Sequence, residues 1–244
     1  MDFCLERLSP FSFSCRACGR CCSGKVIMAG PHEILGMSRL LGIGTTEFLA
    51  KYTDNGGTTL RFGEEDGRCV FVTESACRVH PRRPLVCRLY PLGRATDGTG
   101  EERFARFPKQ EGCEAEYGTD GTIADFLAAQ GVAPYLEWSL RYGEVYRRML
   151  GLLDRIGVEG RVETEDGGEA GAAGSHPVSD RDPLSSWQDI DASLSAYCAA
   201  KGIAVPAGID EAIDLHLAAM QEWLDGLEAR MGAAPEGSEG EEKT

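Results

Sequence analysis

The spacing of apolar residues changes near residue 120 of this chain. Before that point they come in short runs, at 26–28, 60–62, 70–72 and 104–107. Such runs suit brief strands or extended segments rather than long helices. After it, apolar side chains recur at helical spacing over much longer stretches. The pattern predicts an α+β fold: a small irregular first section with short strands and two short helices, followed by a helical C-terminal part.

The two short helices of the first section have recognisable ends. Pro31 is favourable as the residue that opens a helix over 32–41, and Gly42 can end it. Thr46 is expected to cap a second helix over 47–52. A core with so little regular structure needs another source of stability, and a bound metal would supply it.

Longer helices are expected in the rest of the chain. Thr122 can cap a helix that runs to Gln130, and Pro134 can open the next one, whose aromatic residues we expect in the core. Helical spacing returns over 184–201 and 210–231. The last stretch has one apolar face, which we expect to dock on the earlier helices or on a protein partner. It consists of Ile213, Leu217, Met220, Leu224 and Leu227.

Composition divides the chain into five parts. Residues 1–118 are expected to form a cysteine-cluster metal-binding domain, and 119–157 a set of packed helices. Residues 158–183 are acidic, rich in Gly, Ala and Ser, and nearly without large apolar side chains, so they are expected to be a flexible linker. The C-terminal helices should occupy 184–231, and 232–244 should be a disordered tail.

Charge is distributed unevenly along the chain. The net charge is −14, yet residues 1–110 carry an excess of positive charge and the acidic residues gather after residue 110. The acidic part would repel nucleic acid and anionic membranes, so neither is expected as a partner. The start of the chain lacks the basic and apolar regions of a signal peptide, and no stretch is long and apolar enough to span a bilayer. A cytoplasmic protein is expected.

Cysteine is unusually abundant and clustered. The chain has ten, of which eight fall between Cys15 and Cys113. In a reducing compartment, clustered thiols usually bind metal or carry out redox chemistry. The alternative, free structural cysteines without metal, would expose many thiols to oxidation.

The first motif is the stretch 15–22, with cysteines at Cys15, Cys18, Cys21 and Cys22. The first three are separated by two residues each, the spacing of three ligands in ferredoxin-type iron–sulfur sites. Turns between them let backbone N–H groups point at sulfur, and Gly19 permits a positive φ. Adjacent residues of an extended chain point in opposite directions. On that basis Cys22 indicates a second metal position or a bridging thiolate.

The second motif comprises Cys69, Cys77, His80 and Cys87. Cys77 and His80 have the two-residue gap of a zinc ligand pair, although a hydrogen bond to backbone is an equal alternative for His80. Arginines are interleaved with these cysteines, where they would stabilise thiolate charge unless they form a solvated face. They are Arg78, Arg82, Arg83 and Arg88.

The two motifs in this order resemble the YkgJ family of cysteine-cluster proteins, also called the CxxCxxCC family, a zinc- or iron-chelating domain. The resemblance covers roughly residues 13–113 and includes the stretch from Cys77 to Pro91. It implies a set of metal ligands, with Cys113 as a further candidate. The set is Cys15, Cys18, Cys21, Cys22, Cys69, Cys77 and Cys87.

Three functions are compatible with these motifs. The ferredoxin-type spacing and the surrounding arginines favour an iron–sulfur protein in a redox or sensing role, and this is the function that we predict, with zinc as the alternative. The Cys77–His80 pair and the small core favour a zinc protein whose helices bind a partner. A metalloenzyme, with His80 or Tyr90 contacting substrate, is the third. No nucleotide-binding loop and no hydrolase or zinc-protease signature is present to support an enzyme.

Overall fold

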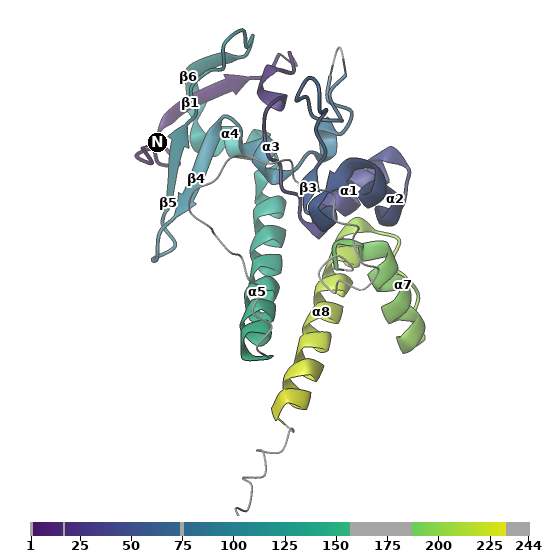
Figure 1. Ribbon diagram of the computed structural model, residues 1–244. Coiled ribbons are helices and arrows are strands. Elements are labelled where there is room, and N and C mark those ends of the chain that lie inside the picture. Colours follow the sequence, from purple (N-terminus) through teal and green to yellow (C-terminus); the bar gives the residue numbers. More distant parts are fainter. Residues whose placement is uncertain (1, 17, 74–75, 157–186, 233–244) are drawn as a thin grey trace, which may run out of the picture.

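The computed structural model describes residues 2–16, 18–73, 76–156 and 187–232. Short strands and cysteine-bearing loops form one end of the molecule, and long helices extend from the other (Figure 1). The α+β class and the helical C-terminal part are confirmed. The expected linker over 158–183 and the tail over 232–244 fall outside the described residues, apart from the tail's first position.

Three small antiparallel sheets organise the first section. β1 (Pro10–Ser14) pairs with β6 (Glu116–Thr122), β2 (Thr53–Asp54) with β3 (Thr59–Leu60), and β4 (Leu92–Thr96) with β5 (Glu102–Arg106). The β1–β6 pair places Phe13 opposite Tyr117 and so brings the start of the first cysteine motif beside the region of Cys113.

The predicted short strands are only partly present. The run at 104–107 coincides with β5 and the run at 60–62 begins in β3, but 26–28 and 70–72 take part only in isolated bridges. β1, β4 and β6 are additional. β6, with the sequence EYGTDGT, has no apolar alternation and forms because β1 pairs with it.

The short helices of the first section follow the sequence closely. α1 (Pro31–Leu41) begins at its proline, and Gly42 ends it with φ 71°. α2 (Thr45–Tyr52) begins earlier than predicted, because Gly44 supplies the extended residue before it. The expected cap at Thr46 is therefore wrong. Shorter pieces are η1 (Arg20–Cys22), η2 (Asn55–Gly57), η3 (His80–Arg82) and α3 (Leu85–Leu89).

Four further helices follow among the described residues. They are α4 (Ile123–Ala129), α5 (Val132–Ile156), α7 (Ile190–Lys201) and α8 (Ile209–Gly232). Thr122 caps α4 as predicted, with its side chain accepting from the Asp125 N–H. α5 starts two residues before Pro134, so the proline lies within the first turn, where its missing N–H costs nothing.

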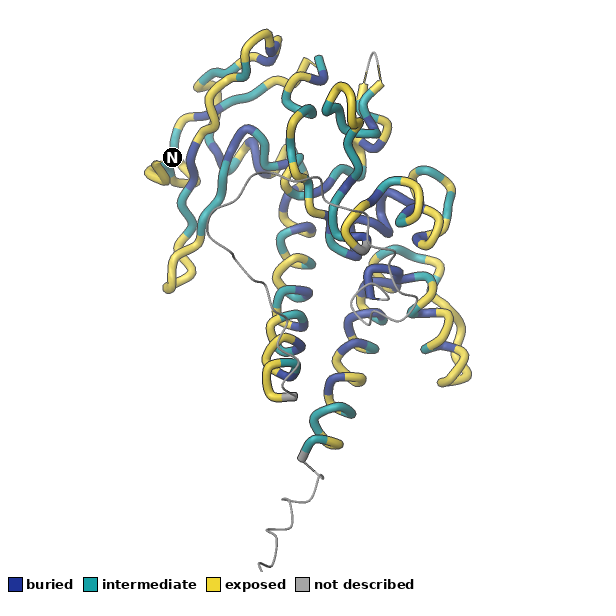
Figure 2. Tube along the Cα trace, in the orientation of Figure 1, coloured by how far each residue is buried: buried dark blue, intermediate teal, exposed yellow. Residues whose placement is uncertain are grey.

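The apolar face of α8 packs inside the chain. Leu217 and Leu224 lie in a core shared with α5, α7 and Leu35 of α1. Tyr135 and Tyr142 of α5 are buried as predicted, and Trp138 and Tyr146 are partly buried, but Leu140 is 59% exposed. Buried positions follow the facing sides of these helices (Figure 2).

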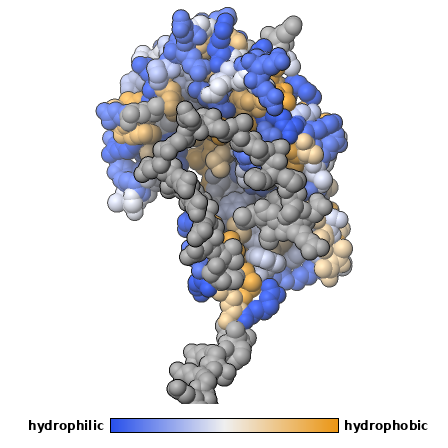
Figure 3. All heavy atoms as spheres, in the orientation of Figure 1, coloured by the Kyte–Doolittle hydropathy of each residue, from blue (hydrophilic) through white to orange (hydrophobic). Residues whose placement is uncertain are grey.

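The outside of the molecule is mainly polar in the view of Figure 3, with apolar residues scattered between charged ones. Among the described residues, no helix combines the length and the apolar character needed to cross a membrane.

Candidate metal centre

The two cysteine motifs meet at the end of the molecule that carries the short strands. The Cys69 N–H donates to the Cys22 carbonyl over 2.9 Å, and Ser23 bridges to Arg68. The end of the first motif is thus bonded to the start of the second. No disulfide joins the cysteines of the described residues.

Four cysteines form one set, which we call the Cys18 group: Cys18, Cys21, Cys22 and Cys113. The Sγ atoms of Cys18 and Cys113 lie 3.9 Å apart, and those of Cys21 and Cys22 are also 3.9 Å apart. The pKa of Cys21 is raised mainly by a hydrogen bond with the Cys22 thiol and by burial, and the charges of Cys22 and Cys18 raise it further. The Cys18 thiol therefore lies near Cys21, and the two pairs adjoin.

The local backbone explains how neighbouring cysteines can face the same way. Gly19 has φ 73°, and the following residues turn into the helical segment η1 rather than an extended strand. The premise that Cys21 and Cys22 point in opposite directions is therefore wrong. Both thiols can approach one ion.

The other four cysteines form the Cys77 group: Cys15, Cys69, Cys77 and Cys87. Burial raises the pKa of Cys87 to about 12, and the nearby Cys69 and Cys77 thiols add to the rise. Burial also raises the pKa of Cys77, to which Cys15 adds. These mutual effects place the four thiols in one neighbourhood. Cys15, predicted to act with Cys18 and Cys21, thus lies close to Cys77.

Backbone N–H groups face the sulfur atoms in both groups. Burial raises the pKa of Cys69, Cys77 and Cys113, and in each case the N–H two residues further along opposes the rise. For Cys18 the N–H of Glu114 is the main cause of a lowered pKa, and the N–H two residues along assists it. The N–H groups that lie two residues after their cysteine are those of Arg20, Phe71, Val79 and Ala115. N–H groups that point at sulfur stabilise the thiolate form, which is the form that binds metal.

Two of the interleaved arginines occupy defined positions. Arg83 adjoins the Cys77 group: burial and Arg88 lower its pKa, whereas the thiols of that group raise it. Arg88 is buried and donates to backbone carbonyls and to the Tyr135 hydroxyl, 2.9 Å away, with its guanidinium 4.0 Å above the Tyr135 ring. Arg88 therefore fixes the loop to α5 instead of lying on a solvated face.

His80 lies at the start of η3 and is exposed. Its Nδ1 is 3.2 Å from Nη1 of Arg83. That guanidinium also donates to the His80 carbonyl over 2.6 Å. His80 as a metal ligand stays a prediction.

Three residues beside the thiols were not predicted from the sequence as parts of a metal site: Glu33, Tyr90 and Tyr117. Glu33 is buried and accepts from the N–H of Leu85, two residues before Cys87. The hydroxyl groups of Tyr90 and Tyr117 are buried and face each other. Burial raises the pKa of both phenols, and Cys21 and Cys113 lie near enough to add to the rise. Tyr90 had been considered only as a substrate contact. Tyr117 becomes visible only through the β1–β6 pairing.

The eight thiols are suitable ligands for metal ions, but the thiols of neither group surround a single metal position. Within the described ranges, no three His, Cys, Asp or Glu side chains converge closely enough to hold an ion. Metal binding would draw the thiols of each group inward. Such coupling of ligand closure to binding is usual, since a finished site rarely exists without its metal.

Comparison with known proteins agrees with this donor set. Residues 14–113 match the family model CxxCxxCC, described as "Putative zinc- or iron-chelating domain". The resemblance noted in the sequence is confirmed over these residues. No curated protein and no solved structure matches the chain.

Proposed function

We propose that this chain, whose residues 14–113 match the CxxCxxCC family model, binds two metal ions, one through the thiolates of each four-cysteine group. The observation that carries the proposal is the backbone pattern. Four cysteines from separate segments each have the N–H of the second following residue directed at sulfur. Hydrogen bonds of this kind stabilise metal-bound thiolates and tune the site. Cysteines that are not joined in disulfides, and metal binding through thiolates, suit a reducing, cytoplasmic location.

Zinc is the metal that the sulfur distances support first. With zinc–sulfur bonds of about 2.3 Å, two thiolates on one tetrahedral ion lie about 3.8 Å apart. The Cys18–Cys113 and Cys21–Cys22 pairs are each separated by 3.9 Å. In a [4Fe–4S] cluster, by contrast, each cysteine binds its own iron. A zinc ion held by four thiolates has no open position, so its role would be to stabilise this section.

An iron–sulfur centre in a redox or sensing role is the second candidate. The two thiol pairs of the Cys18 group would each suit one iron of a [2Fe–2S] cluster, which takes four cysteines. The ferredoxin-type spacing predicts that Cys15, Cys18 and Cys21 are three ligands of one cluster and that Cys22 points away from it. Neither expectation holds in the folded chain, so the iron–sulfur candidate now rests on the two thiol pairs.

Metal analysis of anaerobically purified protein tests the proposal. Wild-type protein from cells supplied with zinc and iron should be colourless and hold about two zinc ions per chain, without acid-labile sulfide. Brown protein with iron and sulfide in equal amounts would transfer the proposal to the iron–sulfur candidate.

Cysteine variants test the two groups separately. Cys18→Ser and Cys87→Ser should each lose about one equivalent of metal, because each removes one of four ligands from a different site. Cys4→Ser is the matched control, since Cys4 is exposed and lies outside both groups. Wild-type protein without metal, or unchanged metal content in both variants, would refute the proposal.

A further inference from the structure

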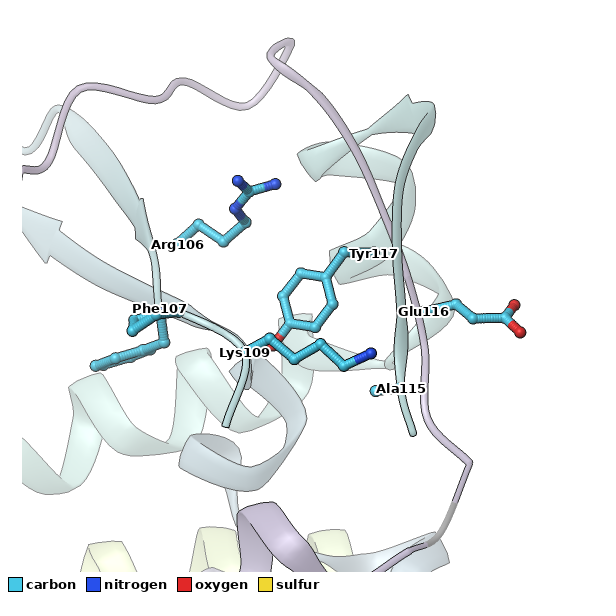
Figure 4. A pocket seen from close by; sticks show the side chains of 7 residues that line it. Arg106, Phe107, Lys109, Ala115, Glu116 and Tyr117 are labelled. Atoms are coloured by element: carbon cyan, nitrogen blue, oxygen red, sulfur yellow. The ribbon is translucent and has the colours of Figure 1, made fainter. Parts of the chain in front are cut away.

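A cavity of about 480 Å³ lies beside the Cys18 group (Figure 4). One wall is the segment 106–109 at the end of β5, and the other is the segment 115–117 at the start of β6. The second wall is continuous with the site, because the Ala115 N–H faces the Cys113 sulfur and Tyr117 lies near Cys113.

The cavity presents donors without an available acceptor. Within the described part of the chain, the exposed side chains of Arg106 and Lys109 have no carboxylate within 4.0 Å. The one acidic side chain in the walls, Glu116, is directed away from the hollow and pairs with Arg16 at 2.6 Å (Figure 4). An acceptor-rich, negatively charged ligand would satisfy these groups.

Aromatic rings form the apolar part of the same cavity. The Tyr117 ring packs edge-on against Phe13, with centroids 5.1 Å apart, and the Phe107 ring stacks on Tyr90 at 6.4 Å. The Arg106 guanidinium lies 5.9 Å from the centre of the Tyr117 ring. These contacts fix the ring orientations, so a flat apolar group meets a preformed surface.

We propose that this cavity binds a small ligand with one oxyanion, a carboxylate or a phosphate, attached to an apolar body. Arg106 and Lys109 hold the oxyanion, and the rings of Tyr117 and Phe107 contact the apolar part. The proposal rests on the proposed function in one respect, that the ligand lies next to a metal centre. Anion binding itself needs only these cavity residues.

Calorimetric titration of the metal-loaded full chain tests the site with three probes: inorganic phosphate, phenyl phosphate and benzoate. Phenyl phosphate should bind more tightly than inorganic phosphate, because it also covers the aromatic rings. Arg106→Gln and Lys109→Gln should each weaken phenyl phosphate binding about tenfold or more, the effect of one charge-assisted contact. Tyr117→Phe should leave it nearly unchanged, because this variant keeps the ring that lines the cavity. Comparing phenyl phosphate with benzoate identifies the preferred oxyanion.

Arg147→Gln is the matched control, since Arg147 is an exposed cation on α5 that does not line this cavity. This variant should bind phenyl phosphate as tightly as the wild type does. Equal binding by all variants, or no saturable binding at millimolar probe, would overturn the anion site. Metal content is measured on the same samples. If the wild-type protein purifies without metal and still binds phenyl phosphate, the anion site stands and the proposed metal function is refuted. If the protein holds its full metal content and does not bind the probes, the metal function stands and the anion site is refuted.

Discussion

Glu33 connects the helical side of the molecule to the second cysteine motif. One carboxylate oxygen accepts from the Gly30 N–H at the start of α1, over 2.8 Å, and the other accepts from the Leu85 N–H at the start of α3, over 2.6 Å. The side chain is only 5% exposed. Since α3 carries Cys87, this carboxylate positions a candidate ligand through the backbone.

Glu33→Gln should lower the free energy of unfolding by about 1 to 3 kcal/mol, the cost of leaving one buried N–H without an acceptor. The amide of glutamine offers one acceptor oxygen where the carboxylate uses two. Urea denaturation of metal-loaded protein measures the change. Glu47→Gln is the control, because Glu47 is exposed and pairs only with Lys51. Equal midpoints for the two variants would show that the Glu33 contacts are not needed.

Individual residue types in the site were predictable, but their grouping was not. The eight cysteines are visible as a cluster in the sequence, and N–H groups directed at sulfur follow from the tight turns around them. The partner of Cys18 could not be found locally, because Cys113 is 95 positions away and reaches it through strand pairing. Arg88 illustrates the same limit, since its burial depends on Tyr135 of α5.

At the scale of single elements, the helices with strong end signals were predicted well. Pro31 and Gly42 bound α1, and Thr122 caps α4, because these residues act within one turn of backbone. The start of α2 was misplaced because two threonines in succession both have capping side chains. In the folded chain, Thr45 and Thr46 instead donate to Asp189, a residue that sequence patterns do not connect to them.

Asp189 joins two elements and caps one of them. Its side chain accepts from the Ala192 N–H at the start of α7 and from the hydroxyl groups of Thr45 and Thr46 in α2. Neighbouring contacts follow the same seam: Asp191 pairs with Arg39 of α1. The C-terminal helices are thereby bonded to the section that carries the cysteines.

Asp189→Ala should destabilise the protein by about 2 to 4 kcal/mol, the sum of a lost helix cap and a buried hydroxyl left without its acceptor. Asp189→Asn should lose less, because asparagine also caps helices well. Thermal unfolding followed by circular dichroism gives both values. Asp154→Ala on the exposed side of α5 is the control and should change little. A loss for Asp189→Ala no larger than for that control would contradict the role of this seam.

The whole molecule contains cores of two kinds. The helical core is built from α5, α7 and α8 with Leu35 of α1, and its members carry no metal-ligand candidates. Two smaller cores lie under the short strands and loops. One includes residues of α4 and the start of α5, and the other includes residues of α1 and α2. Cys69 and Cys77 pack against one of these smaller cores. The stability of that end therefore depends on the thiols, while the helical end has its own apolar interior.

Complete metal removal should accordingly unfold one end of the molecule and leave the other. Without metal, the thiols of each group gain nothing from closing together, and the loops that carry them lack a sufficient core. We expect chelation to expose residues 14–113 to rapid amide hydrogen exchange. Most of the far-ultraviolet helical signal should persist, because α5, α7 and α8 contain most of the helical residues.

Hydrogen exchange resolved by mass spectrometry measures both ends in one experiment, and addition of excess zinc to the chelated sample is the control that should restore protection. Loss of protection in α5 and α8 together with the cysteine loops would mean that the chain unfolds as a single cooperative unit. Unchanged exchange over 14–113 after verified metal removal would mean that the thiols do not stabilise this end through metal. Selective loss in the loops is the outcome that the separate cores require, since residues of a core exchange together only when that core opens.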